Sequence, residues 1–172
     1  MLKALKELFD TLTQPSGAPA NGNREQALKL ATAVLLVEVM RSDADMQPAE
    51  RDAVMQGLGE KFGLSGQALD ELLEQAEQQA REAHDYHYFT SLLNDHLSHP
   101  QKIEVVENMW HVAYADSNLD ANENHLISKI AGLLHVTHGE YIAAKLHARE
   151  AFRSNTDDGA GSHLCGLTPS VP

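Results

Sequence analysis

The chain has 172 residues, 42% of them hydrophobic, which is enough for one domain with a substantial core. Its formal net charge of −12 argues against a nucleic-acid partner and against docking on anionic lipid, since no basic patch is available. The single cysteine, Cys165, cannot form an intramolecular disulfide, and residues 1–12 lack the apolar core of a signal peptide. We therefore expect a cytoplasmic protein.

The first elements predicted along the chain are a short packing helix, a loop and a long buried helix. Residues 1–12 place four apolar side chains on one helical face: Leu2, Leu5, Phe9 and Leu12. Residues 14–23 have the composition of a loop, and the chain turns helical from Arg24. Residues 27–40 contain so few polar side chains that this helix should be buried nearly all round. It is too short to cross a membrane, which takes ~20 residues.

Glu38 interrupts this apolar helix. A buried carboxylate must be paired, protonated or bound to a metal, because leaving it charged and unpaired costs several kcal/mol. Arg41 lies three residues further on, within reach across one helical turn. An ion pair with Arg41 and a role as a metal ligand are therefore both open.

The middle of the chain predicts further helices separated by short turns. Residues 62–65 end one helix at a glycine and cap the next with Ser65. Residues 67–83 form an amphipathic helix whose inner stripe is Leu69, Leu72, Leu73 and Ala76. Residues 84–90 link two halves of the chain and begin a helix that runs to about Leu97.

Three features describe the second half. Pro100 opens a helix that ends at Asp116 and carries Trp110, which we expect to be buried. Thr137 and Glu140 form a capping box that starts a last helix reaching about residue 152. Residues 153–172 are rich in Gly, Ser, Asp and Pro and are predicted to be a disordered tail, so the domain covers residues 1–152.

An acidic motif occurs twice, with a constant offset of 73 residues. Residues 43–50 (Asp-Ala-Asp-Met-Gln-Pro-Ala-Glu) follow one apolar run, and residues 116–123 (Asp-Ser-Asn-Leu-Asp-Ala-Asn-Glu) follow another. Each copy indicates a buried helix, an acidic elbow and a second helix. We therefore predict an all-α compact bundle of about seven to eight helices, built from two pseudo-symmetric helical hairpins at about 24–64 and 100–136.

The simplest interpretation of the elbows is helix capping. Asp120 followed three residues later by Glu123 is a capping-box arrangement. In the first copy Gln47 and Glu50 take the same places, and Pro48 suits the first helical position because a missing N–H costs nothing there.

A second interpretation is that the elbows bind a hard cation. Asp43 and Asp116 stand where the preceding helix should end and its carbonyl dipoles repel a carboxylate. Asp45 and Asn118, two residues on, add oxygen ligands. The pattern is not an EF-hand, because alanine stands where the calcium loop needs glycine and Glu123 comes too early.

These residues resemble the tellurite-resistance TerB family, which includes a domain of DjlA-type co-chaperones. The resemblance rests on residues 35–43, the Pro48 helix start, residues 62–65, Phe89-Thr90, and residues 110–123. It implies an all-helical fold, a role in tellurite or stress resistance without established catalysis, and an acidic cluster proposed to bind a divalent metal. By position that cluster comprises Glu38, Asp43, Glu50, Asp116, Asp120 and Glu123, with Asp45, Asp85, His111 and Asn118 as additional ligands.

The two halves differ at the positions that would hold a metal. Gln47 stands where the second copy has Asp120, and Glu38 aligns with His111. The two sets of ligands are therefore not equivalent, and a symmetric pair of sites is not expected.

Ten histidines include three pairs with three-residue spacing: His84/His87, His96/His99 and His135/His138. That spacing places two imidazoles on one helical face, but two pairs straddle predicted helix ends and lack further ligands, which favours surface histidines. The dipeptide at residues 84–85 also occurs in metal-dependent phosphohydrolases.

Three functions therefore stay open. The first is a non-catalytic binder of a divalent cation that relays metal or oxidant stress to a protein partner. The second is a metal-free helical interaction module. The third is a helical phosphohydrolase that uses Glu38, Asp43, His84, Asp85 and Asp116. The identity of the ion, the partner and self-association are not fixed by the sequence.

Overall fold

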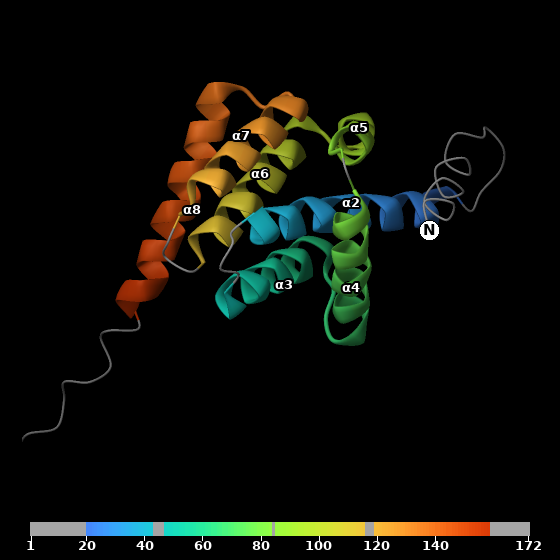
Figure 1. Ribbon diagram of the computed structural model, residues 1–172, viewed down its shortest axis with the longest axis horizontal. Helices are drawn as coiled ribbons and strands as arrows, with labels where there is room; N and C mark the ends of the chain where they lie inside the picture. The colour runs from blue at the N-terminus through green and yellow to red at the C-terminus, as the bar shows by residue number, and fades with distance from the viewer. Residues whose placement is uncertain (1–19, 43–46, 84, 116–118, 159–172) are drawn as a thin grey trace, which may run out of the picture.

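The structure is a computed structural model, and it describes residues 20–42, 47–83, 85–115 and 119–158. These residues form helices and no strands (Figure 1). The helices are α2 (Ala20–Ser42), α3 (Pro48–Phe62), α4 (Gln67–Glu82), α5 (His87–His96), α6 (His99–Tyr114), α7 (Ala121–Leu133) and α8 (His138–Asp158). The predicted all-α fold is confirmed.

Helix α2 is the central element of the bundle. Residues 30–37 are all buried, as the apolar run predicts, and the helix contacts α3, α4, α5, α6 and α7. Figure 1 shows α2 running across the molecule, with α4 and α6 crossing it. Trp110 of α6 is 0% exposed, which confirms its predicted place in the core.

The two predicted hairpins pack crosswise. The core helix of each hairpin contacts the second helix of the other, because α2 packs against α7 and α3 packs against α6. Both hairpins also continue into a third helix in the same way, since α4 packs on α2 and α8 packs on α6. The repeat therefore comprises three helices, α2–α3–α4 and α6–α7–α8, which is one helix more in each half than the sequence predicted.

The turn before the third helix has the same geometry in both halves. Gly63 and His135 both adopt left-handed backbone conformations, with φ of 64° and 59°. The next amide donates to a carbonyl five residues back in each case, Leu64 to Gly59 at 3.1 Å and Val136 to Ala131 at 3.0 Å. This is a helix C-terminus that normally uses glycine. The offset at these turns is 72 residues rather than 73.

Three predicted helix boundaries were wrong. Helix α2 begins at Ala20 instead of Arg24, so residues 20–23 of the expected loop are helical. Helix α4 is preceded by Gly66 and not capped by Ser65, because the Gly66 carbonyl accepts from the amides of the first turn.

The third correction concerns the end of the last helix. Helix α8 continues past residue 152 to Asp158, so residues 153–158 do not belong to a disordered tail. These residues include no Gly or Pro, and the Ser154 and Thr156 hydroxyls donate to the carbonyls of Glu150 and Arg153 at 3.0 Å and 2.8 Å. Such bonds satisfy the polar side chains within the helix.

Several predictions concern residues that the structure does not describe. They are the N-terminal packing helix, the rest of the tail and Cys165. Among the described helices, none combines the length and the apolar character that crossing a lipid bilayer requires.

Candidate functional site

The acidic elbows lead into two helices that begin with the same hydrogen bond. At the start of α3 the Gln47 amide donates to Glu50 Oε2 at 2.8 Å. At the start of α7 the Asp120 amide donates to Glu123 Oε2 at 2.9 Å, and Asp120 Oδ1 accepts from the Asn122 amide at 2.7 Å. The predicted capping boxes are therefore present.

Glu50 and Glu123 are also deeply buried. Each is 0% exposed, although capping glutamates are usually solvated on a helix surface. Each lies one helical turn from a core residue, Val54 and Ile127, both of which are 0% exposed. The crosswise packing of the hairpins thus places two carboxylates, at equivalent positions, inside the bundle next to the elbows.

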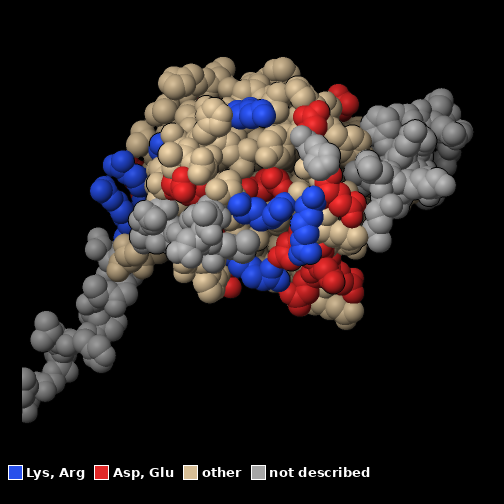
Figure 2. All heavy atoms as spheres, viewed as in Figure 1, with Lys and Arg blue, Asp and Glu red and all other residues tan. Residues whose placement is uncertain are grey.

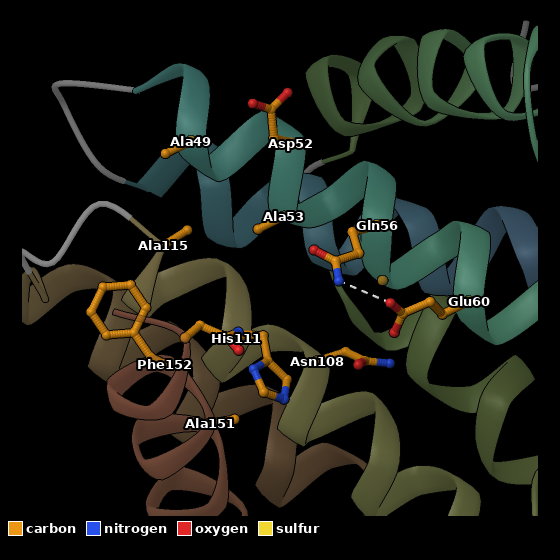
Figure 3. A pocket seen from close by; sticks show the side chains of 12 residues that line it. Ala49, Asp52, Ala53, Gln56, Glu60, Asn108, His111, Ala115, Ala151 and Phe152 are labelled. Carbon is orange, nitrogen blue, oxygen red and sulfur yellow. Dashed lines mark hydrogen bonds between the residues drawn. The ribbon is translucent and has the colours of Figure 1, made fainter. Parts of the chain in front are cut away.

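The elbows connect to one cleft. Asp43, Asp45, Asp116 and Asn118 lie outside the described residues, but their neighbours in the chain are described. Ala49 follows the first elbow and Ala115 precedes the second, and both line the same cleft. Figure 3 shows them across from each other, at the end of the cleft where α3 begins and α6 ends. The start of α3 and the end of α6 are therefore neighbours.

The cleft, as we call it below, lies between α3 on one wall and α6 with α8 on the other, and has a volume of about 380 Å³ (Figure 3). Its floor and walls are mainly small side chains, with polar groups from α3 and α6. It is lined by Ala49, Asp52, Ala53, Gln56, Gly57, Glu60, Asn108, His111, Ala115, Ala151, Phe152 and Asn155.

Glu38 is held by two partners. Arg41 Nη1 donates to Glu38 Oε1 at 2.9 Å, and the Tyr86 hydroxyl donates to Glu38 Oε2 at 3.2 Å. Burial raises the pKa of the Glu38 carboxyl above its ordinary value, and Arg41 and Tyr86 oppose that shift. The alternative of an ion pair with Arg41 is thus the one present, and it ties α2 to the segment before α5.

Two additional predicted ligands have structural contacts of their own. Asp85 Oδ1 accepts from the His87 amide at 3.0 Å, which caps the start of α5. His111 Nε2 lies 3.8 Å from Glu107 Oε1, one turn away on α6, and His111 also lines the cleft. Within the described ranges, no group of three His, Cys, Asp or Glu side chains is arranged to hold a metal ion.

The described histidines are mostly exposed, as predicted. His96 ends α5 whereas His99 begins α6, and His135 precedes α8 whereas His138 begins it, so these pairs do straddle helix ends. His84 lies outside the described residues. His99 Nε2 lies 2.8 Å from Glu140 Oε1 and links the starts of α6 and α8.

Charge is unevenly distributed over the surface. Acidic side chains gather over α4 and the adjoining part of α3 (Figure 2). On α4 they include Asp70, Glu71, Glu74, Glu77 and Glu82. Glu77 bonds Arg51 of α3, so part of this acidic face serves to join α3 to α4.

Sequence reasoning missed the cleft. Its α3 wall has small residues one turn apart, Ala49, Ala53 and Gly57. The second hairpin has Leu126 and Ile130 in the last two of these places. That contrast between two otherwise similar helices is a signal that an alignment of the two halves could have detected.

Comparison with known proteins agrees with this architecture. The chain matches the family model described as tellurite resistance protein TerB over residues 29–146. The matched region runs from within α2 into α8, so it includes both hairpins and both elbows. No match was found among curated proteins or among solved structures. Because the family model covers well over half of the chain, the protein belongs to the TerB family.

Proposed function

We propose that this TerB protein is a non-catalytic binder of a divalent cation, held where the two acidic elbows meet the starts of α3 and α7. The observation that carries the proposal is the burial of Glu50 and Glu123, both 0% exposed, directly after the elbows. Carboxylates removed from water require nearby positive charge or donors. A hard cation with oxygen ligands would supply that charge.

The position of the cleft supports a single shared site rather than two. Ala49 and Ala115, which adjoin the two elbows in the chain, line the same cleft. Asp43, Asp45, Asp116, Asn118 and Asp120 would then supply oxygen ligands from both halves. Binding would fix the ends of α2 and α6 relative to α3 and α7, and a cytoplasmic partner would sense this change under metal or oxidant stress.

A second candidate is a metal-free interaction module. It is favoured by the capping boxes, since Glu50 and Glu123 already accept backbone amides at helix starts. The phosphohydrolase hypothesis has less support. Of its proposed residues, Glu38 bonds Arg41 and Tyr86, and Asp85 caps α5, whereas the other three lie outside the described residues.

Thermal unfolding after chelation distinguishes the first two functions. The full chain is measured with and without Ca²⁺, Mg²⁺, Mn²⁺ or Zn²⁺, beside the double variant Asp43→Asn/Asp116→Asn. An ion at one hundred times its Kd stabilises the folded state by about 2.7 kcal/mol. For a chain of this size that corresponds to a rise in the midpoint of roughly 5–10 °C.

A matched control separates a site from a general charge effect. The variant Asp70→Asn/Glu74→Gln removes two carboxylates from the exposed face of α4. It should keep the full ion-dependent rise, and the elbow variant should lose it. If no ion shifts the wild-type midpoint, or if both variants respond alike, the elbows are structural caps and the proposal is wrong.

A further inference from the structure

Helix α5 packs on a surface formed by α2 and α7, which we call the α5 seat. Three contacts define it. The Tyr86 hydroxyl, just before α5, donates to Glu38 of α2 at 3.2 Å. Lys129 Nζ of α7 lies 5.4 Å from the centre of the Tyr86 ring. Near the end of α5, the Asn94 amide donates to the Leu133 carbonyl of α7 at 2.8 Å.

The pseudo-symmetry of the fold predicts a second surface of the same kind. Exchanging the halves replaces α2 by α6 and α7 by α3. The three residues that contact α5 are Glu38, Lys129 and Leu133, and the 73-residue offset relates them to His111, Gln56 and Glu60. All three of these counterparts line the cleft. The cleft is therefore the second-half equivalent of the α5 seat.

The cleft differs from the α5 seat in the size of its side chains. Leu126 and Ile130 of α7, 8% and 0% exposed, correspond to Ala53 and Gly57 of α3. A Cβ atom added at Gly57 would meet nothing closer than 4.0 Å, where Asn108 lies. The cleft is therefore deep enough to receive large apolar side chains from a bound segment.

The cleft is also acidic at its rim. Asp52 and Glu60 are exposed on α3, and neither forms an ion pair within the described part of the chain. By contrast, Glu77 and Glu104 on neighbouring helices are paired with Arg51 and Lys61. Free carboxylates around an apolar floor are complementary to positive charge on an incoming segment.

We propose that the cleft between α3, α6 and α8 is a docking site for a short cationic amphipathic helix of a partner protein. The helix packs large apolar residues against Ala53 and Gly57 and places Lys or Arg beside Asp52 and Glu60, in the helix-in-groove mode. This inference uses residues outside the proposed ion ligands apart from His111, so it stands or falls independently of the cation site.

Helix α5 itself provides the probe. The cationic peptide copies residues 85–97 with Asp85→Lys and Asp95→Lys, and the unmodified peptide is its control of equal shape and opposite charge. Each is titrated into the isotope-labelled full chain and followed by NMR. The cationic peptide should shift the resonances of Ala53, Gly57 and Asn108, and should bind about tenfold more tightly than the control at low salt.

Two variants of the full chain test the location. Gly57→Leu fills the cleft and should abolish binding of the cationic peptide, whereas Gly57→Ala leaves most of the space open and should keep it. Both replacements favour helix at this position, so the fold should be retained. Asp52→Lys/Glu60→Lys should weaken binding about tenfold, and Glu71→Lys/Glu74→Lys, on the exposed face of α4, should not.

Four results would overturn the proposal. The first is equal binding to the Gly57→Leu variant, and the second is resonance shifts confined to the α5 seat on α2 and α7. The third is binding at least tenfold tighter to a chain ending at residue 158, which would assign the cleft to the chain's own tail. The fourth is a dimer in sedimentation that the peptide dissociates, which would assign the cleft to a second copy.

Discussion

The two halves of this protein have the same three helices but differ in what covers them. In the first half α3 turns at Gly63, and in the second α7 turns at His135. The seat on α2 and α7 is covered by α5, whereas the equivalent surface on α6 and α3 is an open cleft. The comparison teaches that an internal repeat can fix a fold while leaving one of two equivalent surfaces available for binding.

The largest expected difference between the halves is in the core. Trp110 takes the place of Val37 and packs against the rings of Tyr114 and Tyr141, with centroids 5.8 Å and 5.5 Å away. Trp110→Ala should lower the free energy of unfolding by about 3–5 kcal/mol, and Val37→Ala by about 2 kcal/mol. Urea unfolding measures both, and equal losses would show that the aromatic cluster adds nothing to the second half.

The turns before the third helices should respond in opposite directions to exchange of their residues. His135 has a φ of 59°, a conformation that is strained for a residue with a side chain. His135→Gly should raise the free energy of unfolding by about 0.5–1 kcal/mol, and Gly63→His should lower it by about 1 kcal/mol. If His135→Gly destabilises the protein, contacts of the imidazole outweigh the backbone strain.

The smallest expected effect concerns acid. Helix α8 begins with a capping box, whereas α4 begins at Gly66 without a side-chain cap. Hydrogen bonds from the Thr137 backbone and side chain, and then from His99, lower the pKa of Glu140 from 4.5 to about 2. Ionised Glu140 therefore stabilises the fold fully above pH 4.5, and this contribution is lost as the pH falls towards about 2.

The acid effect can be measured by comparing chemical unfolding of the wild type and Glu140→Gln between pH 5 and pH 2. The wild type should lose more stability than the variant over this window. NMR titration of the Glu140 carboxyl gives the pKa directly. A pKa near the ordinary value would show that the box does not hold the carboxylate in solution.

Helix starts were the features most securely predicted from the sequence. The pairs Asp120/Glu123 and Thr137/Glu140 form their capping hydrogen bonds as expected, because such bonds join residues three apart and need no distant contact. Helix ends were less predictable. Helix α8 runs to Asp158 through polar residues that merely lack a helix breaker, so nothing local marks where it stops.

The third helix of the repeat was missed for a physical reason. The apolar stripe of α8 includes Tyr141, Ala144 and Ala148, which are offset by 72 residues from Leu69, Leu72 and Ala76. The elbows are offset by 73, so one residue is lost at the intervening turn and a fixed-offset comparison loses the match. The cleft could not be predicted either, since it requires α3, α6 and α8 to be placed together in space.

The packing of Trp110 also makes the protein its own optical sensor. It is the chain's only tryptophan, it is 0% exposed, and Lys145 Nζ lies 4.6 Å from the centre of its ring. Tyr114, stacked on it, is the last residue of α6 and stands two residues before the second elbow. Emission from one indole, excited directly or by energy transfer from this tyrosine, therefore follows events at the elbow without any added label.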